Sequence, residues 1–481
     1  MKSPSSTPTL LTRPSRRTVL LSGAAGLLLS ACGGGGDDPV GLLPETPTTP
    51  TTPTDPTNPI NPGTTGPWAT PLTLTTGASL TASLLNIACN DAGDAIAVWQ
   101  EGSVSGTRRL LGRRYRVDLG WDPVHEIAAT NNSHALETDL AMDVSGQAWV
   151  VWTQQFTVSN QTWAARHLPL GGWQPAVKVN TTDDAVLTSH ARVSVNTQGN
   201  AIVGWLSNRG DPTTQVFVRP WLGDSGWGAE TIVNTDVNSN PTSLVLALGP
   251  LGDGVVGWIE SYGARPTVWA ARWNLASGGQ VNGQITAVGS ATDLSIATDA
   301  NGTTLMAWRH VFAAAERVST VRFPATGSPA PFVSHDNPAP GAVGRPSVDA
   351  GGPGQFSVVW SELLGTRRDA WGTQIAASDN APPCVLLEND SSEDAHSVQI
   401  ALDPTNEARA AWMRGAGSQG EIWSARQPFN SPWAAPERIG NSTNDASSLH
   451  LAGSAGGRAL VAWLQPEAGV QRVWVQHRQP G

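Results

Sequence analysis

The feature that most constrains this chain is a self-similar unit that recurs eight times from about residue 85 onward. Each unit contains a tryptophan at the end of an apolar run, and successive tryptophans of this kind are 50 to 53 residues apart. A unit of this size cannot bury its apolar face alone, so neighbouring units must stack to form a continuous core. These eight anchor tryptophans are Trp99, Trp152, Trp205, Trp258, Trp308, Trp360, Trp412 and Trp463.

Each unit opens with the signature of a tight hairpin. Six residues before the anchor stands a glycine, replaced in the seventh unit by Asn406, and asparagine tolerates positive φ better than most residues. In five of the eight units Asp or Asn lies three residues earlier, as in Asp143-Val144-Ser145-Gly146. This spacing between two apolar runs is typical of a type I turn followed by a left-handed residue, so we predict two antiparallel strands.

Two further strands complete the unit. About eleven residues past the anchor comes a second segment rich in β-formers, for example residues 268–272. About ten residues later a tryptophan begins a fourth segment, as at Trp121, Trp173, Trp227 and Trp433. Four antiparallel strands in about 52 residues is the size of one β-propeller blade.

The ends of the repeat array distinguish a closed ring from an open stack. Residues 68–74 are expected to form a fourth strand with no first three before it, and Trp68 precedes Trp99 by 31 residues, in phase with the other units. The eighth unit supplies only its first three strands. An open stack would need capping repeats, whereas a ring closes when the N-terminal strand completes the last blade. We therefore predict an all-β fold, an eight-bladed β-propeller over residues 66–481 with four antiparallel strands per blade.

The N-terminus carries the features of an export signal. Arg16 and Arg17 precede an apolar run too short to span a membrane permanently, and Leu29-Ser30-Ala31-Cys32 follows. This order resembles bacterial lipoproteins, which implies that residues 1–31 are a signal peptide and that Cys32 is acylated after cleavage. An ordinary secretory signal is the alternative, and the paired arginines leave open whether the twin-arginine or the general route exports the chain.

Residues 32–65 are predicted to comprise the acylated cysteine and a linker rich in proline and threonine. Proline occupies every third position from Pro44 to Pro62, a period that matches polyproline II, although an unstructured linker fits the composition too. We expect Cys32 to anchor the protein in a membrane. The lipoprotein resemblance implies outer-membrane retention because Gly33 rather than Asp follows, and the protein would be periplasmic or surface-exposed.

The repeat pattern over residues 68–481 resembles the sialidase-like and lectin-like β-propeller superfamily. The resemblance implies the fold but not an activity: the Asp-to-Gly spacing is longer than in the Asp-box of sialidases, and their arginine motif is missing. A sialidase also needs a tyrosine nucleophile with a glutamate partner and an aspartic acid, and this sequence has only Tyr115 and Tyr262. Glu260 lies two residues before Tyr262, so a carbohydrate-active enzyme stays an alternative.

The candidate ligand-binding residues come just after the anchors. If the first strand of each blade runs along the ring axis and the second returns, the loop after each anchor lies on the same face as the loops between blades. Polar loops on a rigid scaffold are where proteins usually bind ligands, although a merely solvated loop fits any one of these residues. The predicted ligand-binding residues are Glu101, Glu260, Tyr262, His310, Glu362 and Arg414.

Two further side chains repeat with the unit. The anchor tryptophans are expected to pack between blades, the alternative being platforms that stack on sugars. An arginine recurs 14 residues past the anchor in six units and is expected to hydrogen-bond neighbouring strands, the alternative being a ring of ligand-binding arginines. These arginines are Arg113, Arg166, Arg219, Arg272, Arg322 and Arg426.

The sequence carries no other recognisable chemistry. Its nine histidines form no ligand cluster, and it lacks zinc-protease, serine-hydrolase and phosphate-loop motifs, so we predict no catalytic residues, no metal and no cofactor. A net charge of −10 argues against nucleic acid as a partner. We predict a monomer that acts as a non-catalytic envelope or cell-surface binding propeller for a glycan or protein ligand. The alternatives are a scaffold lipoprotein in envelope assembly and, less favoured, a sialidase-like carbohydrate-active enzyme.

Overall fold

The computed structural model describes most of residues 68–479, which belong to a compact unit spanning Pro56–Gly481. The predicted signal peptide at residues 1–31, Cys32 and the linker at residues 32–65 lie outside the described residues. No helix among the described residues is long and apolar enough to cross a membrane. Between 68 and 479 the positions left undescribed are 76, 78, 104–105, 107, 130–133, 182–185, 209–212, 224, 235–239, 263–264, 287–288, 336–340, 378–381, 389–392, 416–419 and 441–444.

The described chain folds into eight small antiparallel sheets, which we number as blades 1 to 8 from the first complete one. In each blade the strands follow one another outward from the ring axis, and in blades 1 to 3 the outermost strand is divided in two. The strands of the first four blades are β2 (Thr81–Cys89), β3 (Ala95–Gly102), β4 (Arg108–Arg116), β5 (Gly120–Trp121) and β6 (His125–Ala129) in blade 1, β7 (Ala135–Met142), β8 (Ala148–Gln155), β9 (Asn160–Leu168), β10 (Gly172–Trp173) and β11 (Val177–Lys178) in blade 2, β12 (Thr188–Val195), β13 (Ala201–Ser207), β14 (Gln215–Leu222), β15 (Gly226–Trp227) and β16 (Thr231–Ile232) in blade 3, and β17 (Ser243–Leu248), β18 (Asp253–Tyr262), β19 (Arg265–Asn274) and β20 (Gly278–Gln284) in blade 4.

The remaining four blades have four strands each. The strands are β21 (Ser290–Thr298), β22 (Thr304–Phe312), β23 (Ala315–Phe323) and β24 (Val333–His335) in blade 5, β25 (Ser347–Ala350), β26 (Phe356–Leu364), β27 (Arg367–Ile375) and β28 (Val385–Leu386) in blade 6, β29 (Ala395–Leu402), β30 (Ala408–Arg414), β31 (Glu421–Gln427) and β32 (Glu437–Ile439) in blade 7, and β33 (Ser447–Ser454), β34 (Arg458–Glu467), β35 (Val470–Arg478) and β1 (Leu72–Thr73) in blade 8. The only helix among the described residues is a 3-10 turn, η1 (Ala455–Gly457), between β33 and β34.

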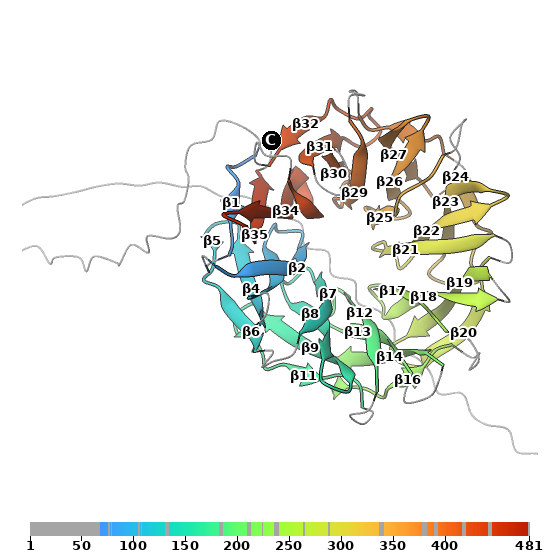
Figure 1. Cartoon of the computed structure of the whole chain (residues 1–481). Coiled ribbons are helices and arrows are strands. Elements are labelled where there is room, and N and C mark those ends of the chain that lie inside the picture. The colour runs from blue at the N-terminus through green and yellow to red at the C-terminus, as the bar shows by residue number, and fades with distance from the viewer. Residues whose placement is uncertain are drawn as a thin grey trace, which may run out of the picture. The chain divides into compact units, whose positions relative to one another are not determined.

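The blades form a closed ring around a central axis (Figure 1). The innermost strands contact one another in an unbroken circle, from β2 through β7, β12, β17, β21, β25, β29 and β33 back to β2. The predicted all-β, eight-bladed β-propeller is therefore confirmed.

The hairpin between the first and second strands forms as the sequence predicts. In blade 2, Oδ1 of Asp143 accepts hydrogen bonds from the backbone N–H groups of Ser145 and Gln147, both at 2.9 Å. Gly146 then adopts φ +83°, and Asn406 adopts φ +68° at the same position of blade 7. The acidic side chain stabilises the turn by accepting these backbone hydrogen bonds. The left-handed residue reverses the chain direction, so the second strand runs antiparallel to the first.

The hydrophobic core lies between the blades. Each anchor tryptophan is at most 1% exposed, and Trp152 of blade 2, for example, packs with Ile96 and Val98 of blade 1. Removing a buried tryptophan side chain typically costs about 3–5 kcal/mol of stability. The packing interpretation is therefore confirmed, and the anchors are not platforms that stack on sugars.

The N-terminal strand closes the ring, as predicted. β1 pairs antiparallel with β35, with Leu72 opposite Val475, and the N–H of Leu74 donates to the carbonyl of Val473 at 2.8 Å. The last blade therefore combines strands from both ends of the described chain, which leaves no unpaired edge at β35.

Trp68 fixes this strand by bridging blades 7 and 8. Its ring is 9% exposed, and its indole N–H donates to Oε1 of Glu437 at 2.7 Å. The guanidinium of Arg409 lies over the ring, 5.6 Å from the centroid. Two side chains of blade 7 thus hold a residue that precedes the closing strand of blade 8.

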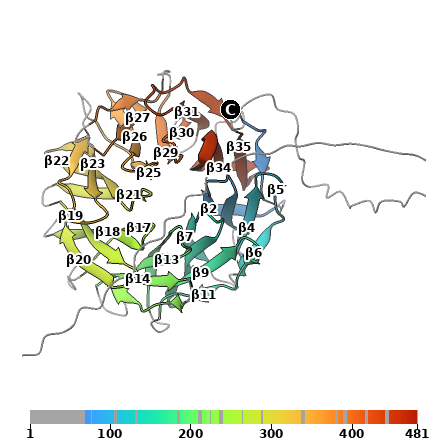
Figure 2. The ribbon, with the colours of Figure 1, turned by 180° about the vertical axis from the view of Figure 1, so that it is seen from behind.

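The two faces of the ring differ in what they carry, and Figure 2 shows the ring from the opposite side. The loop face carries the connections between blades and those between second and third strands. The turn face carries the tight first-to-second and third-to-fourth turns. Trp68 lies opposite Arg478, the last residue of β35, so the chain enters the ring on the turn face.

We expect the substitution Trp68→Ala to lower the free energy of unfolding by about 3–5 kcal/mol, because it removes a buried indole together with its hydrogen bond and cation–π contact. The amides of β35 should also exchange faster, because the closing strand is held less firmly. Denaturant unfolding and hydrogen exchange measure the two effects. Trp227→Ala, in an internal blade, serves as the control and should leave exchange in β35 unchanged. Equal exchange in wild type and Trp68→Ala would contradict this account of closure.

Candidate binding site at the ring axis

The structure places the residues predicted for ligand binding on strands and not in loops. They lie on second strands, Glu101 on β3, Glu260 on β18, His310 on β22, Glu362 on β26 and Arg414 on β30. Their exposed fractions range from 0% for Glu101 to 7% for Arg414. The prediction that they lie in exposed loops is therefore wrong, because the second strand continues past the anchor and stays paired with the third strand.

The three buried glutamates have a partner within their own repeat. Each accepts a hydrogen bond from the indole N–H of the anchor two residues earlier, at 2.9 Å for Glu101, 2.7 Å for Glu260 and 2.9 Å for Glu362. Gln154 and Gln465 accept the same bond from their anchors. A buried N–H without an acceptor costs about 1–3 kcal/mol. The pattern Trp-x-Glu/Gln therefore satisfies the most buried donor of the repeat.

Three blades carry a different residue at this position, namely Ser207 in blade 3, His310 in blade 5 and Arg414 in blade 7. His310 lies beside Trp308, with ring centroids 6.3 Å apart, and the guanidinium of Arg414 lies 4.4 Å from the centroid of Trp423. In the described part of the chain, the indole N–H groups of Trp308 and Trp412 have no hydrogen-bond acceptor. In the five blades with glutamate or glutamine at this position, that side chain provides the acceptor that these two indole N–H groups lack.

Two predicted residues cannot be placed in the same way. Tyr262 is the last residue of β18, and its side chain lies outside what the structure describes, as does Cys32. A ligand-binding role for the predicted set stays a prediction, while the geometry gives its buried members structural contacts.

The arginines that recur past the anchors bind backbone carbonyls and neighbouring side chains. Arg219 donates to the carbonyl of Val179 in blade 2 at 2.7 Å, and Arg322 donates to that of Ala376 in blade 6 at 2.7 Å. Arg426 forms an ion pair with Glu407 at 2.6 Å. The structural interpretation is confirmed for these arginines, which tie blades together or brace a turn.

The innermost strands contain a feature that sequence reasoning missed. In five blades, two residues of this strand lie opposite the anchor, which makes a β-bulge. The first of the two adopts a left-handed φ of 50° to 58° although it is not glycine, a conformation that costs about 1–2 kcal/mol. A bulge redirects a side chain. The five residues are Leu84, His190, Asp293, Ser397 and Ser448.

The bulge position is always fifteen residues before the anchor, which identifies its equivalents in the other blades. These are Glu137, Ser243 and Arg345 in blades 2, 4 and 6. Seven of the eight residues at this register are therefore polar or charged, within strands that are otherwise largely apolar. All lie near the start of the innermost strands, at the loop-face end of the axis. A polar or charged residue fifteen positions before seven of the eight anchors is the sequence signal that could have found them.

Several polar side chains next to this register cap the free edges of the innermost strands. Oδ2 of Asp139 accepts a hydrogen bond from the N–H of Val193 in the next blade at 2.9 Å, and Oδ2 of Asp349 accepts one from Leu402 at 2.8 Å. Because the edge of an innermost strand has no further strand beside it, these N–H groups need side-chain acceptors. Some of the polar residues near the axis therefore stabilise the fold by accepting backbone hydrogen bonds from the next blade.

Ion pairs join most of the remaining charges. Nη1 of Arg192 lies 3.6 Å from Oε2 of Glu137, and Nε of Arg309 lies 3.1 Å from Oδ2 of Asp293. Arg192, Glu137 and Asp293 lie on innermost strands, whereas Arg309 lies on β22, the second strand of blade 5. These pairs hold the side chains in place and leave little net charge of their own.

Arg345 is the exception among the axial charges. It is exposed, and in the described part of the structure no hydrogen bond or ion pair holds its guanidinium. Burial nevertheless lowers its pKa, with Arg192 acting in the same direction and Asp293 and Asp139 opposing it. Protein thus surrounds a side chain that is still open to solvent.

Two neighbours of Arg345 have shifted pKa values for the same reason. Burial lowers the pKa of His450 to about 4, and the charge of Arg345 adds to the effect, so this imidazole is neutral at pH 7. Burial raises the pKa of Asp139, although Arg192 and the N–H of Val193 act against the shift. Groups from blades 2, 3, 5, 6 and 8 therefore influence one another across the axis. We call Asp139, Arg192, Asp293, Arg345 and His450 the axial cluster.

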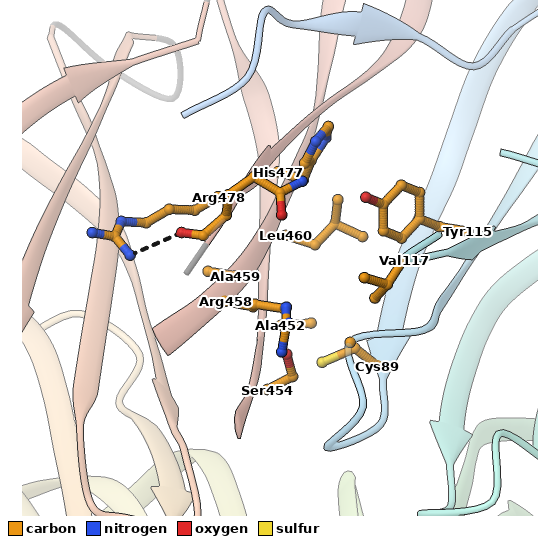
Figure 3. A pocket seen from close by; sticks show the side chains of 12 residues that line it. Cys89, Tyr115, Val117, Ala452, Ser454, Arg458, Ala459, Leu460, His477 and Arg478 are labelled. Carbon is orange, nitrogen blue, oxygen red and sulfur yellow. Dashed lines mark hydrogen bonds between the residues drawn. The ribbon is translucent and has the colours of Figure 1, made fainter. Parts of the chain in front are cut away.

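A small cavity at the seam between blades 8 and 1 is not a comparable site (Figure 3). Its volume is about 20 Å³, room for a single water molecule, and Cys89, Tyr115, Leu460 and His477 are among the residues that line it. Burial raises the pKa of the Cys89 thiol to about 12, and this thiol donates to the carbonyl of Gly453 at 2.7 Å. The thiol is thus protonated and unreactive at neutral pH. Among the described residues no group of three or more potential ligands is placed to hold a metal ion.

Glu388 is a second buried ionisable group, at the rim of blade 6. Its Oε1 accepts a hydrogen bond from the N–H of Ala370 at 2.7 Å, a bond that Asn180 and Asn234 provide in blades 2 and 3. Burial raises the pKa of Glu388 to about 7, and Asp369 contributes to the rise. Within the described structure its second carboxylate oxygen is buried without a partner. Blade 6 thus uses an acid where other blades use an amide.

Comparisons with known proteins give distant structural similarities. No protein-family model matches the sequence, and no curated protein does. Similar solved structures include a protein of unknown function from Dyadobacter fermentans, at 10% identity over 64% of this chain and 98% of the other, with a TM-score of 0.40. They also include a polysaccharide lyase titled as an ulvan lyase, at 8% identity over 76% and 94% of the chains with a TM-score of 0.46, and a Hadza microbial sialidase, at 10% identity over 59% and 63% with a TM-score of 0.39. At these values the activities of those proteins are not assigned to this chain.

We expect Glu260→Ala to lower the free energy of unfolding by about 1–3 kcal/mol, because it leaves the buried indole N–H of Trp258 without an acceptor. Glu260→Gln should be close to neutral, because Gln154 and Gln465 already accept this bond in blades 2 and 8. Urea unfolding of the two variants measures the difference. If Glu260→Gln destabilised as much as Glu260→Ala, the hydrogen-bonding role assigned to this carboxylate would be wrong.

The raised pKa of Glu388 predicts a specific pH dependence. Between pH 4.5 and about 7 the folded protein holds a proton on Glu388 that the unfolded chain has released, so stability falls as the pH rises through this range. The loss amounts to about 3 kcal/mol. Glu388→Gln keeps the acceptor for Ala370 and should remove this part of the slope in urea unfolding. Glu393→Gln, at an exposed carboxylate, is the control and should parallel wild type. If the stability of Glu388→Gln depended on pH in the same way as that of the wild type, the raised pKa assigned to Glu388 would be refuted.

Proposed function

We propose that this chain is an exported, lipid-anchored propeller that binds a glycan or protein ligand on its loop face without converting it. The observation that carries the proposal is the β-bulge that recurs opposite the anchors and brings polar side chains from several blades to the loop-face end of the axis.

The bulges support binding because the fold does not require them. Blade 4 pairs its innermost strand with the second strand without any register shift, so a blade can be built without a left-handed residue. Five other blades accept this strain at the same position. Strained backbone that the architecture does not need is concentrated at functional sites in proteins.

The chemistry of the axis supports a polar ligand. His190 and Ser243 are partly exposed and Ser397 and Ser448 are exposed, and they add hydroxyl and imidazole groups to the charges of the axial cluster. Such groups donate and accept hydrogen bonds in several directions. A hydroxylated or charged surface matches them better than an apolar one.

A non-catalytic role fits the carboxylates with raised pKa. Asp139 and Asp349 both accept backbone hydrogen bonds from the next blade, which occupies an oxygen that a general acid would use. Glu260, the glutamate that kept an enzyme as an alternative, is 2% exposed and accepts the indole N–H of Trp258. These acids therefore have structural tasks.

The export signal and Cys32 support attachment to a membrane. The first described residue, Trp68, lies on the turn face of the ring, opposite the loop face. This arrangement leaves the loop face free for a ligand.

An apolar patch favours a scaffold as the second candidate. Leu136, Phe156, Val158 and Leu187 are 44%, 40%, 79% and 51% exposed. Backbone hydrogen bonds place their segments side by side at the loop face of blades 2 and 3, from Gln155 to His134 and from Asn160 to Val186. Exposed apolar side chains that cluster in this way are typical of contacts between proteins.

A face-blocking experiment tests the proposal. In the body from residue 56 onward, with Cys384→Ser, a single cysteine is introduced at Val158→Cys on the loop face or at Leu170→Cys on the turn face, both exposed positions. Each is then coupled to a bulky polyethylene glycol maleimide, while Cys89 stays unmodified because its thiol is protonated. On glycan and envelope-protein arrays, we expect the polymer at position 158 to abolish binding and the polymer at position 170 to leave it unchanged.

Two outcomes would overturn the proposal. Binding that survives the polymer at position 158 would place the ligand elsewhere. Release of shortened products from a bound glycan would replace the non-catalytic role by an enzymatic one.

A further inference from the structure

Arg345 differs from the other arginines near the axis in having no fixed partner. Arg192 and Arg309 form ion pairs at 3.6 Å and 3.1 Å, and Nη1 of Arg192 also donates to the carbonyl of Ala191 at 2.8 Å. Arg345 is exposed and, among the described residues, forms neither a hydrogen bond nor an ion pair. Its five N–H donors are therefore open to a ligand.

Arg345 lies at the loop-face end of the innermost strand of blade 6. It stands fifteen residues before Trp360, the register at which five other blades carry the bulge residue. It lies two residues before β25, with Pro346 between them. The accessible end of the axis therefore carries one guanidinium without a counter-ion.

The surroundings of Arg345 leave room for one negative charge. Arg192 is a second positive group close enough to act on Arg345, while His450 beside it is neutral. Asp293 and Asp139 lie within electrostatic range, but Asp293 is paired with Arg309 and Asp139 accepts the N–H of Val193. Because Arg192 is paired with Glu137 as well, Arg345 is the charged group of the axial cluster that forms no hydrogen bond or ion pair among the described residues.

We propose that Arg345 binds the oxyanion, a carboxylate or a sulfate, of the ligand at the ring axis. The proposal rests on the loop-face binding described above and names the chemistry that the site recognises. A planar guanidinium binds such a group through two parallel hydrogen bonds, which a lysine cannot reproduce. Ser397 and Ser448, exposed at the same register in blades 7 and 8, supply hydroxyl groups for the rest of the ligand.

The test uses the full chain in detergent and three small probes, sodium sulfate, D-glucuronate and neutral D-glucose, titrated by calorimetry at low ionic strength. We expect sulfate and glucuronate to bind and glucose to bind at least tenfold more weakly. Arg345→Gln should weaken both anions at least tenfold, and Arg345→Lys should restore only part of the affinity. Arg438→Gln removes an exposed, ion-paired arginine of blade 7 and should change nothing. Urea unfolding verifies that each variant is folded.

The outcomes separate this inference from the proposed function. Stronger binding of glucuronate than of sulfate would indicate a sugar acid, and the reverse would indicate a sulfated group; both support the inference. Equal affinities for wild type and Arg345→Gln would overturn it. If array ligands still bound the loop face and Arg345→Gln left that binding unchanged, the oxyanion site would be refuted while the binding function stood.

Discussion

The burial of one tryptophan per blade is the interaction on which the rest of this structure depends. Each anchor packs against the sheet of a neighbouring blade, and five of them donate to a glutamate or glutamine two residues later. Because the acceptor is so close in sequence, these five blades satisfy the buried indole N–H within their own repeat. Stability is thereby distributed over eight similar interfaces, and only the last of them requires a strand from the other end of the chain.

That distribution of stability leaves the axis free for other tasks. The anchors and recurring arginines hold blades together at a distance from the axis, so the innermost strands can carry bulges, left-handed residues and charges without loss of the fold. Side chains of Asp139, Asp349 and several serines cap the exposed strand edges. The remaining polar groups differ from blade to blade, and this difference makes one end of a nearly symmetric ring chemically specific.

The asymmetry between the two faces follows from how the ring closes. The N-terminal strand runs from the turn face toward the loop face, because it pairs antiparallel with β35. The position of Trp68 on the turn face and that of the axial cluster at the loop-face end of the axis are therefore consequences of one topology. The proposed anchorage and the proposed binding surface do not compete for the same side of the molecule.

The sequence by itself determined the number of blades, the hairpin turns, the packing role of the tryptophans and the closure by Trp68, because these depend on spacing and on local conformational preference. It could not determine where the second strand ends, so Glu101, Glu260 and Glu362 were assigned to loops although they lie buried on strands. Only the tertiary structure decided that Arg345 has no partner among the described residues while Arg192 is paired with Glu137, because both facts depend on groups more than 50 residues apart in different blades. Contacts between blades are set by the geometry of the ring, and no local pattern in a single repeat specifies them.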